Sequence, residues 1–150
     1  MSHKNFFEFN FESLKFFLNK DLQIEEKKIS MRSKQIWQSV YKKGSFEINN
    51  LTTFPLELRN KLKDTISLQR PKIIKTQTSS DGTIKWLIKL FDGNEVECVY
   101  IPEKTRATLC ISSQVGCTLN CRFCHTGTQR LVKNLSFAEI INQVMIAKEQ

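Results

Sequence analysis

Three cysteines, Cys117, Cys121 and Cys124, lie within eight residues at a C-x-x-x-C-x-x-C spacing. Cysteine thiolates are the soft ligands that hold iron–sulfur clusters. A four-iron cluster held by three cysteines keeps one iron without a protein ligand, and a small molecule can bind and react there. The spacing therefore predicts a 4Fe-4S site that carries out chemistry rather than one that only braces the fold.

Other roles for these cysteines fit the sequence less well. Tetrahedral zinc takes three cysteines and a histidine such as His125, but its ligands usually come as two separated pairs, and Cys124 and His125 are adjacent. Residues 121–125 also fit the C-x-x-C-H haem-attachment pattern, which belongs to exported proteins, and we expect no export signal here. The odd count of five cysteines and a reducing compartment disfavour disulfides. Chance clustering of three structural cysteines is improbable at this spacing.

The composition, 40% hydrophobic and 25% charged, is that of a folded soluble protein. Phenylalanines crowd residues 1–20, but Glu8, Glu12 and Lys15 interrupt every apolar run. We therefore expect neither a signal peptide nor a membrane span, and a cytoplasmic location. The net charge of +8 favours polyanionic partners, above all nucleic acid, although a lysine-rich composition by itself accounts for it about as well.

Residues 11–66 are predicted to form helices around a small core, because apolar residues recur there at helical spacing. The periodic positions are Phe11, Leu14, Phe17, Leu18, Ile36, Trp37, Val40, Tyr41, Leu58, Leu62 and Ile66. Ser33 is a candidate N-cap, Gly44 a stop, and Pro55 the opening of a third helix. The basic residues of this region either face solvent or contact phosphates. They are Lys27, Lys28, Arg32, Lys34, Lys42 and Lys43.

Beyond Pro71 the pattern changes to strands. Apolar residues alternate with lysines over 84–90, and turn signals occupy 80–82 and 92–94. A second strand over 95–101 is closed by Pro102, so residues 72–101 are predicted to form a small antiparallel meander. A further short apolar strand over 108–112 leads toward the cysteines.

After the cysteines, Ser136 and Glu139 match a capping box and open a predicted helix over 137–149. Its apolar stripe is Phe137, Ile140, Ile141, Val144 and Met145. A cysteine loop between a strand and a helix is typical of the first βα unit of an α/β barrel or sheet, whose ligand sites lie at the C-terminal ends of strands. One unit cannot close a barrel, and roughly 100 to 200 further residues would be expected. We therefore expect the chain to be truncated, as a fragment or the product of a disrupted gene.

The cysteine spacing after a strand resembles that of the radical S-adenosylmethionine (SAM) superfamily. Its flanks are similar to one family within it, the RlmN-type dual-specificity RNA methyltransferases, relatives of the Cfr resistance enzymes. The resemblance extends from about Leu14 to Gln150 and covers the N-terminal part of such an enzyme. Its motifs are Ser79-Ser-Asp-Gly-Thr-Ile-Lys-Trp86, Val99-Tyr-Ile-Pro102, Arg106-Ala-Thr-Leu-Cys-Ile-Ser-Ser-Gln-Val-Gly-Cys117 and Asn134-Leu-Ser-Phe-Ala-Glu-Ile-Ile-Asn-Gln-Val144.

The expected fold class is α/β. Residues 1–70 would form a small helical domain, which in this family contacts RNA, and residues 71–104 a short antiparallel β-meander linker. Residues 105–150 would hold the first β-loop-α unit of an incomplete radical SAM α/β barrel, with the cluster-binding loop.

The resemblance implies methylation of adenine carbon 2 in large-subunit ribosomal RNA and in certain transfer RNAs. It implies a 4Fe-4S cluster and SAM as cofactors, an electron donor such as flavodoxin, and a monomer. Carbon 2 of adenine is electron-poor, so its methylation needs a radical. The cofactors supply the radical, and the protein positions the cofactors. Two alternatives stay open: Cfr-like methylation of adenine carbon 8, and a non-catalytic basic RNA-binding module with a structural zinc site.

By motif position, Cys117, Cys121 and Cys124 are the implied cluster ligands. Cys110 matches the family's second functional cysteine, which helps to resolve the protein–RNA intermediate and can form a disulfide with the methyl-carrying cysteine. Glu97 matches a glutamate that accepts a proton or contacts adenine.

Two cysteines of the comparison do not fit this pattern of roles. Cys98 has no matching role and is expected to be structural. The methyl-carrying cysteine of the family has no counterpart here, so we expect the 150-residue chain to be inactive by itself.

Overall fold

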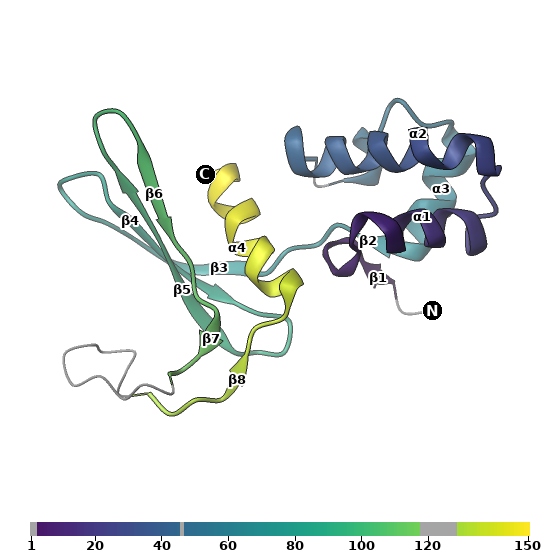
Figure 1. Cartoon of the computed structure of the whole chain (residues 1–150). Helices are drawn as coiled ribbons and strands as arrows, with labels where there is room; N and C mark the ends of the chain where they lie inside the picture. Colours follow the sequence, from purple (N-terminus) through teal and green to yellow (C-terminus); the bar gives the residue numbers. More distant parts are fainter. Residues whose placement is uncertain (1–2, 46, 118–128) are drawn as a thin grey trace. The chain divides into compact units, whose positions relative to one another are not determined.

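The computed structural model describes residues 3–45, 47–117 and 129–150 (Figure 1). The chain forms two compact units, Met1–Gln69 and Arg70–Gln150, which are described separately. Cys121, Cys124 and His125 lie outside the described residues. No helix in the described part of the chain is long and apolar enough to cross a membrane.

The first unit is helical, with one short parallel strand pair in which Lys4 lies opposite Ile66. Its strands are β1 (Lys4–Asn5) and β2 (Ile66–Ser67). Its α-helices are α1 (Phe11–Lys20), α2 (Glu26–Trp37) and α3 (Leu56–Thr65). Shorter helical turns are η1 (Phe6–Glu8), η2 (Gln38–Lys42) and η3 (Ile48–Asn50), of which η2 is a π-helical turn that continues α2.

Local capping and apolar spacing explain α1. The Asn10 side chain accepts a hydrogen bond from the Ser13 backbone N–H at 2.8 Å, and the Ser13 hydroxyl accepts one from the Asn10 N–H at 2.9 Å, so two unpaired donors are satisfied. The helix buries Leu14, Phe17 and Leu18, as predicted. They join a core that also contains Phe6, Phe7, Ile36, Leu51 and Leu62.

The second helix differs from its prediction at its start. It begins at Glu26, and Ser33 is not an N-cap but lies buried inside it, where its hydroxyl donates to the Ile29 carbonyl at 2.8 Å. This bond satisfies the buried hydroxyl within the helix. Gly44 follows η2 with a φ of +71°, which is the conformation expected of a helix stop.

The second unit is built on a four-stranded antiparallel sheet in the order β3-β4-β5-β6. The strands are β3 (Lys72–Thr78), β4 (Ile84–Lys89), β5 (Glu95–Pro102) and β6 (Ala107–Cys110). The predicted meander is confirmed, and glycines with positive φ occupy its first two turns, at Gly82 and Gly93. The strand predicted over 108–112 ends at Cys110 and pairs antiparallel with β5, so it extends the same sheet.

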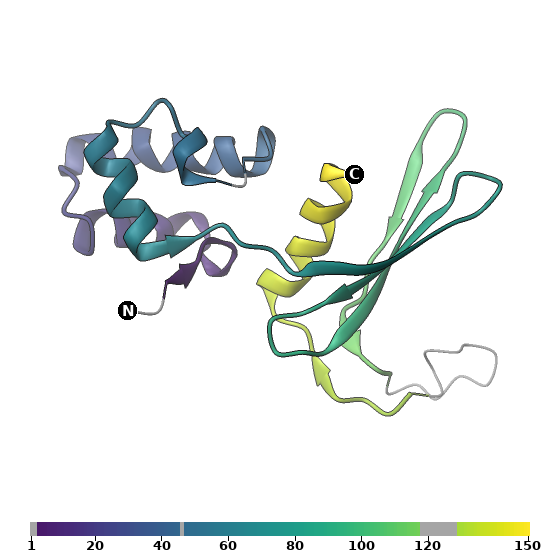
Figure 2. The ribbon, with the colours of Figure 1, turned by 180° about the vertical axis from the view of Figure 1, so that it is seen from behind.

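One face of this sheet is covered by α4 (Phe137–Glu149), which lies across it in both ribbon views (Figures 1 and 2). Trp86, Ile88, Val96 and Cys98 point to this face and pack with Ile146 of the helix. The capping box is confirmed, because Ser136 and Glu139 exchange both of its hydrogen bonds.

The predicted stripe of α4 is only partly correct. Phe137 is 63% exposed and is wrong as a core residue, whereas Met145 is buried. The buried face of the helix instead includes the two amides Asn142 and Gln143. The helix is therefore seated by polar as well as apolar contacts.

Candidate active site

The residues that flank the cysteine segment form a short antiparallel pair of strands. β7 (Gln114–Val115) pairs with β8 (Lys133–Asn134), and Cys117 follows β7 after Gly116. The Cys117 N–H donates to the Gln129 carbonyl at 3.1 Å, and the Val132 N–H donates to the Val115 carbonyl at 2.8 Å. The two ends of the segment are thus held together at its base.

Gly116 makes this close approach possible. Its φ is +77°, and a Cβ at this position would lie 2.1 Å from the Arg130 carbonyl oxygen. A side chain is excluded both by the left-handed backbone and by contact with the opposing segment. The glycine in the Val-Gly-Cys117 motif therefore has a steric role at the base of the cysteine loop.

Glu97 and Cys110 lie on the same face of the sheet, opposite the face that α4 covers. Val99 and Cys110 are partners in the β5–β6 register, and Glu97 is two residues from Val99, so its side chain points the same way. Both residues are exposed. The structure therefore brings together two predicted site residues from neighbouring strands.

Glu97 lines two hollows on this open face. Its carboxylate forms an ion pair with Lys85 of β4 at 3.0 Å. A hollow of about 270 Å³ beside it is lined by Lys75, Gln77, Lys85, Leu87 and Glu97. The Glu97 carboxylate thus shares a hollow with two lysines, Lys75 of β3 and Lys85 of β4.

A second pocket connects Glu97 with the base of the cysteine loop. Its volume is about 290 Å³. Its lining residues are Leu87, Glu95, Val96, Glu97, Ser112, Gln114, Gly116 and Gln129. The pocket is rich in carboxylate, hydroxyl and amide groups, which suits a polar ligand with several hydrogen-bonding edges.

Cys98 faces the opposite way, into the core beneath α4. Burial, together with the nearby Cys110 thiol, raises the pKa of Cys98 to about 11. Its thiol therefore stays protonated at neutral pH, in keeping with a structural role. Cys98 and Cys110 are both free thiols, and the disulfide implied for Cys110 stays a prediction.

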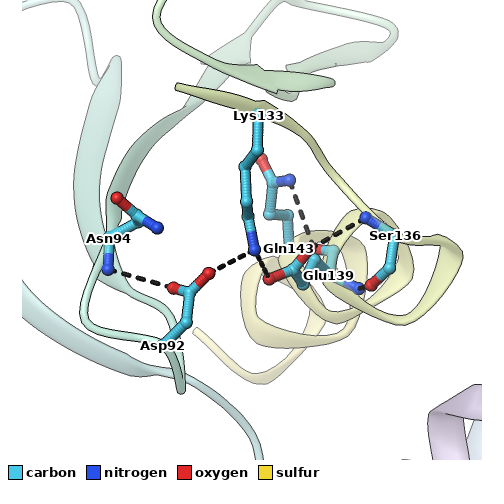
Figure 3. Close-up of polar contacts among 6 residues, drawn as sticks. All are labelled: Asp92, Asn94, Lys133, Ser136, Glu139 and Gln143. Carbon is cyan, nitrogen blue, oxygen red and sulfur yellow. Dashed lines mark hydrogen bonds and ion pairs between the residues drawn. The ribbon is translucent and has the colours of Figure 1, made fainter. Parts of the chain in front are cut away.

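A charged cluster anchors the exit of the cysteine loop (Figure 3). The Lys133 ammonium lies between Asp92, in the β4–β5 turn, and Glu139, at the start of α4, with a 2.7 Å contact to the latter. Hydrogen bonds from Lys133 and Asn94 lower the pKa of Asp92 to about 2. Burial acts to raise the pKa of Glu139, but bonds from Lys133 and Ser136 outweigh it and the pKa is lowered. Both carboxylates are therefore ionised around Lys133 at neutral pH.

Gln143 is a site residue that sequence reasoning missed. It is fully buried in α4, and its side-chain amide contacts both the N–H and the carbonyl of Ser112, each at 2.8 Å. The Ser112 hydroxyl in turn donates to the Glu97 carbonyl at 2.8 Å. A glutamine between the apolar positions of a predicted helix is the signal that could have revealed it.

The assignment of Cys117, Cys121 and Cys124 as cluster ligands stays a prediction. Among residues 3–45, 47–117 and 129–150, no three His, Cys, Asp or Glu side chains are grouped to hold a metal. Of the predicted cysteine ligands, only Cys117 is described, half-buried at the base of the loop beside the Glu97 pocket. A cysteine at that position has the donor chemistry of a cluster ligand.

Comparison with solved structures identifies the class of protein to which this fold belongs. The crystal structure of a radical SAM methyltransferase from Sphaerobacter thermophilus matches with a TM-score of 0.84 and 29% identity, over 97% of this chain and 42% of that one. The chain thus has the fold of a radical SAM methyltransferase over the part it spans. No family model matches the sequence.

Curated sequence relatives narrow this class of methyltransferase to one family. The dual-specificity RNA methyltransferase RlmN of Rhodopseudomonas palustris strain BisB5 is 52% identical over 126 residues, 80% of this chain and 32% of that protein. The RlmN of Bradyrhizobium sp. strain ORS 278 is 47% identical over 136 residues, 87% of this chain and 34% of that protein. The chain is therefore an RlmN-type sequence, and it spans about a third of the length of these relatives.

Proposed function

We propose that this chain is part of a radical SAM methyltransferase that methylates carbon 2 of adenine in large-subunit ribosomal RNA and in transfer RNAs. The observation that carries the proposal is the C-x-x-x-C-x-x-C motif inside RlmN-type flanks, with Cys117 at the base of a loop beside the Glu97 pocket. The relatives at 47–52% identity support the assignment.

In this proposal Cys117, Cys121 and Cys124 hold the 4Fe-4S cluster, and its remaining iron takes SAM. When bound, these cofactors supply the radical chemistry that an electron-poor carbon requires. The residues of the chain orient the reactants. The hydrogen bond from the Cys117 N–H to the Gln129 carbonyl would help to fix the position of the first of these ligands.

Glu97 and Cys110 have separate proposed roles on the open sheet face. The Glu97 carboxylate, oriented by Lys85, accepts a proton from the substrate or contacts the adenine edge. The exposed Cys110 thiol assists in releasing the RNA from the protein. Their common face lets both groups approach the same nucleotide.

The helical unit has a proposed role in RNA binding. A target adenine in folded RNA must be unstacked before an enzyme reaches it, so a separate RNA-contacting module is useful. Exposed lysines such as Lys34 and Lys43 are candidates for phosphate contacts. Arg32 is less suited, because it donates to the Thr53 carbonyl and stacks over Phe54. We further propose a monomer that works in the cytoplasm with an electron donor such as flavodoxin.

Anaerobic reconstitution with iron and sulfide tests the proposal. We expect about four irons and four sulfides per chain, with an electron paramagnetic resonance signal of the reduced protein that changes when SAM is added. Cys117→Ala should lose the cluster. Cys98→Ala, which removes a buried thiol outside the motif, is the matched control and should keep it. Bound zinc without sulfide would overturn the proposal and favour a structural metal module.

A further inference from the structure

Gln143 is an unusual residue for its position. It is fully buried on the face of α4 that covers the sheet, where the neighbouring position Ile146 is apolar. Burying an amide is costly unless its hydrogen-bonding groups are satisfied. A side chain of this kind needs a specific polar partner, which helix packing alone would not provide.

That partner is the backbone of Ser112. The Gln143 Oε1 accepts from the Ser112 N–H at 2.8 Å, and its Nε2 donates to the Ser112 carbonyl at 2.8 Å and to the Glu139 carbonyl at 3.3 Å. The amide therefore replaces both hydrogen bonds that a neighbouring strand would give to Ser112. It does so just beyond Cys110, where β6 has ended.

Ser112 links this contact to the site. Its hydroxyl donates to the backbone carbonyl of Glu97 at 2.8 Å, and it also lines the pocket that reaches the base of the cysteine loop. In sequence it lies between Cys110 and Cys117. The segment that connects these two cysteines is thus attached to α4 on one side and to the strand of Glu97 on the other.

The helix that carries Gln143 is itself anchored to the exit of the loop. Glu139 caps the helix and contacts Lys133 of β8 at 2.7 Å (Figure 3). The segments that enter and leave the cysteine loop are therefore both hydrogen-bonded to residues in the first two turns of α4. A displacement of the helix would change both.

We propose that Gln143 is a positioning residue. It holds Ser112 in place and thereby fixes the positions of Glu97 and Cys110 relative to the segment that leads to Cys117. The proposal rests on the proposed function for its consequence in the reaction. The contact itself is independent of the cofactor. Within the described part of the chain, the hydrogen bonds of the Gln143 amide go to Ser112 and Glu139 and not to a predicted reacting group, so its effect is exerted through Ser112.

Amide hydrogen exchange tests the contact in the whole chain. In Gln143→Met, which keeps the length of the side chain but removes its amide, the Ser112 amide should exchange about tenfold faster, as expected for one lost hydrogen bond. The Trp86 and Cys98 amides, within the β4–β5 pair, should be unchanged. Gln150→Met, at the exposed end of the same helix, is the matched control and should alter neither.

Uniformly faster exchange over the sheet would overturn the proposal, because it would show a general structural role. Unchanged exchange of Ser112 would also overturn it. If Gln143→Met does not fold, the unsubstituted protein decides: exchange of Ser112 as fast as that of the exposed turn residue Lys104 would exclude the contact.

A second measurement connects the contact to the cluster. After reconstitution, Gln143→Met should lose iron to a chelator about tenfold faster than the unsubstituted protein, the size of effect seen for residues that orient metal ligands. Equal loss from both proteins would contradict the positioning role. Failure of the unsubstituted protein to bind a cluster would instead refute the proposed function, and the exchange result would still decide the contact.

Discussion

Gly116 and Gly93 show how the same residue type has different roles at two positions. Both have left-handed backbones, with φ of +77° and +88°. Apart from Gly93 itself and its chain neighbours, no atom of the described residues lies within 4 Å of a Cβ added at Gly93, whereas at Gly116 the Arg130 carbonyl oxygen would lie at 2.1 Å. Gly93 serves a turn, and Gly116 serves the contact between two chain segments.

This difference gives a matched pair of substitutions. Gly93→Ala should destabilise the protein by about 1 kcal/mol, the strain of a left-handed non-glycine residue. Gly116→Ala should cost at least about 2 kcal/mol more, because the backbone of Arg130 must move. Denaturant unfolding followed by circular dichroism measures both. Equal losses would mean that the loop base adjusts freely and that the close approach is unimportant.

At the scale of elements, the turn before β5, the strand β8 and the helix α4 meet at Lys133. The side chain of Lys133 is 30% exposed, that of Asp92 38% and that of Glu139 16%. Solvent screens such a partly exposed cluster, so its contribution to stability is modest. Its effect is mainly to fix where the loop exit joins the helix.

The cluster predicts a pH dependence with a definite sign. The pKa of Asp92 is lowered in the folded state to about 2, so its stabilising effect is complete above its ordinary pKa and is lost as the pH falls through about 2. Lys133→Met should therefore reduce the free energy of unfolding by about 1 kcal/mol at pH 6, and the difference should shrink toward pH 2. Urea unfolding over this range measures it, with the exposed Lys104→Met as control. A difference that is constant with pH would exclude the ion pair as its source.

At the scale of the whole molecule, the 23 Lys and Arg residues outnumber the 15 Asp and Glu residues, and they include both ion-paired and exposed lysines. Lys27 and Lys28 both pair with Glu25, so part of the basic composition is neutralised on the surface. Lys34 and Lys43 are exposed and belong to the unit proposed to bind RNA. Polyanion binding through such residues is electrostatic and falls with added salt.

RNA binding should therefore weaken with salt in a way that depends on which lysines are removed. For single-stranded RNA, each phosphate contact adds about 0.7 to the slope of log affinity against log salt. The pair Lys34→Gln and Lys43→Gln should reduce this slope by about 1.4 if both contact phosphates. Lys72→Gln with Lys104→Gln, in the second unit, removes the same charge and serves as control. An equal reduction by both pairs would show that net charge, and not the helical unit, directs binding.

Much of the site could be predicted from sequence because its signals are local. The cysteine spacing is a pattern of eight consecutive residues, and the alternation over 84–90 and the Ser136–Glu139 capping box are equally short in sequence. Hydrogen bonds and side-chain periodicity at that range depend little on the rest of the chain. The family motifs also marked Glu97 and Cys110, although not that they share a face.

Only the tertiary structure decided which residues far apart in the sequence come into contact. Gln143 and Ser112 are 31 residues apart, and Lys133 and Asp92 are 41 apart. Sequence periodicity made Phe137 a core residue and Ser33 a cap, and both expectations failed because burial depends on which elements pack together. The sequence by itself thus determined the elements and the chemistry of their side chains. The strand register and the packing of α4 determined which side chains meet, since a buried polar group is stable only where the fold provides its partner.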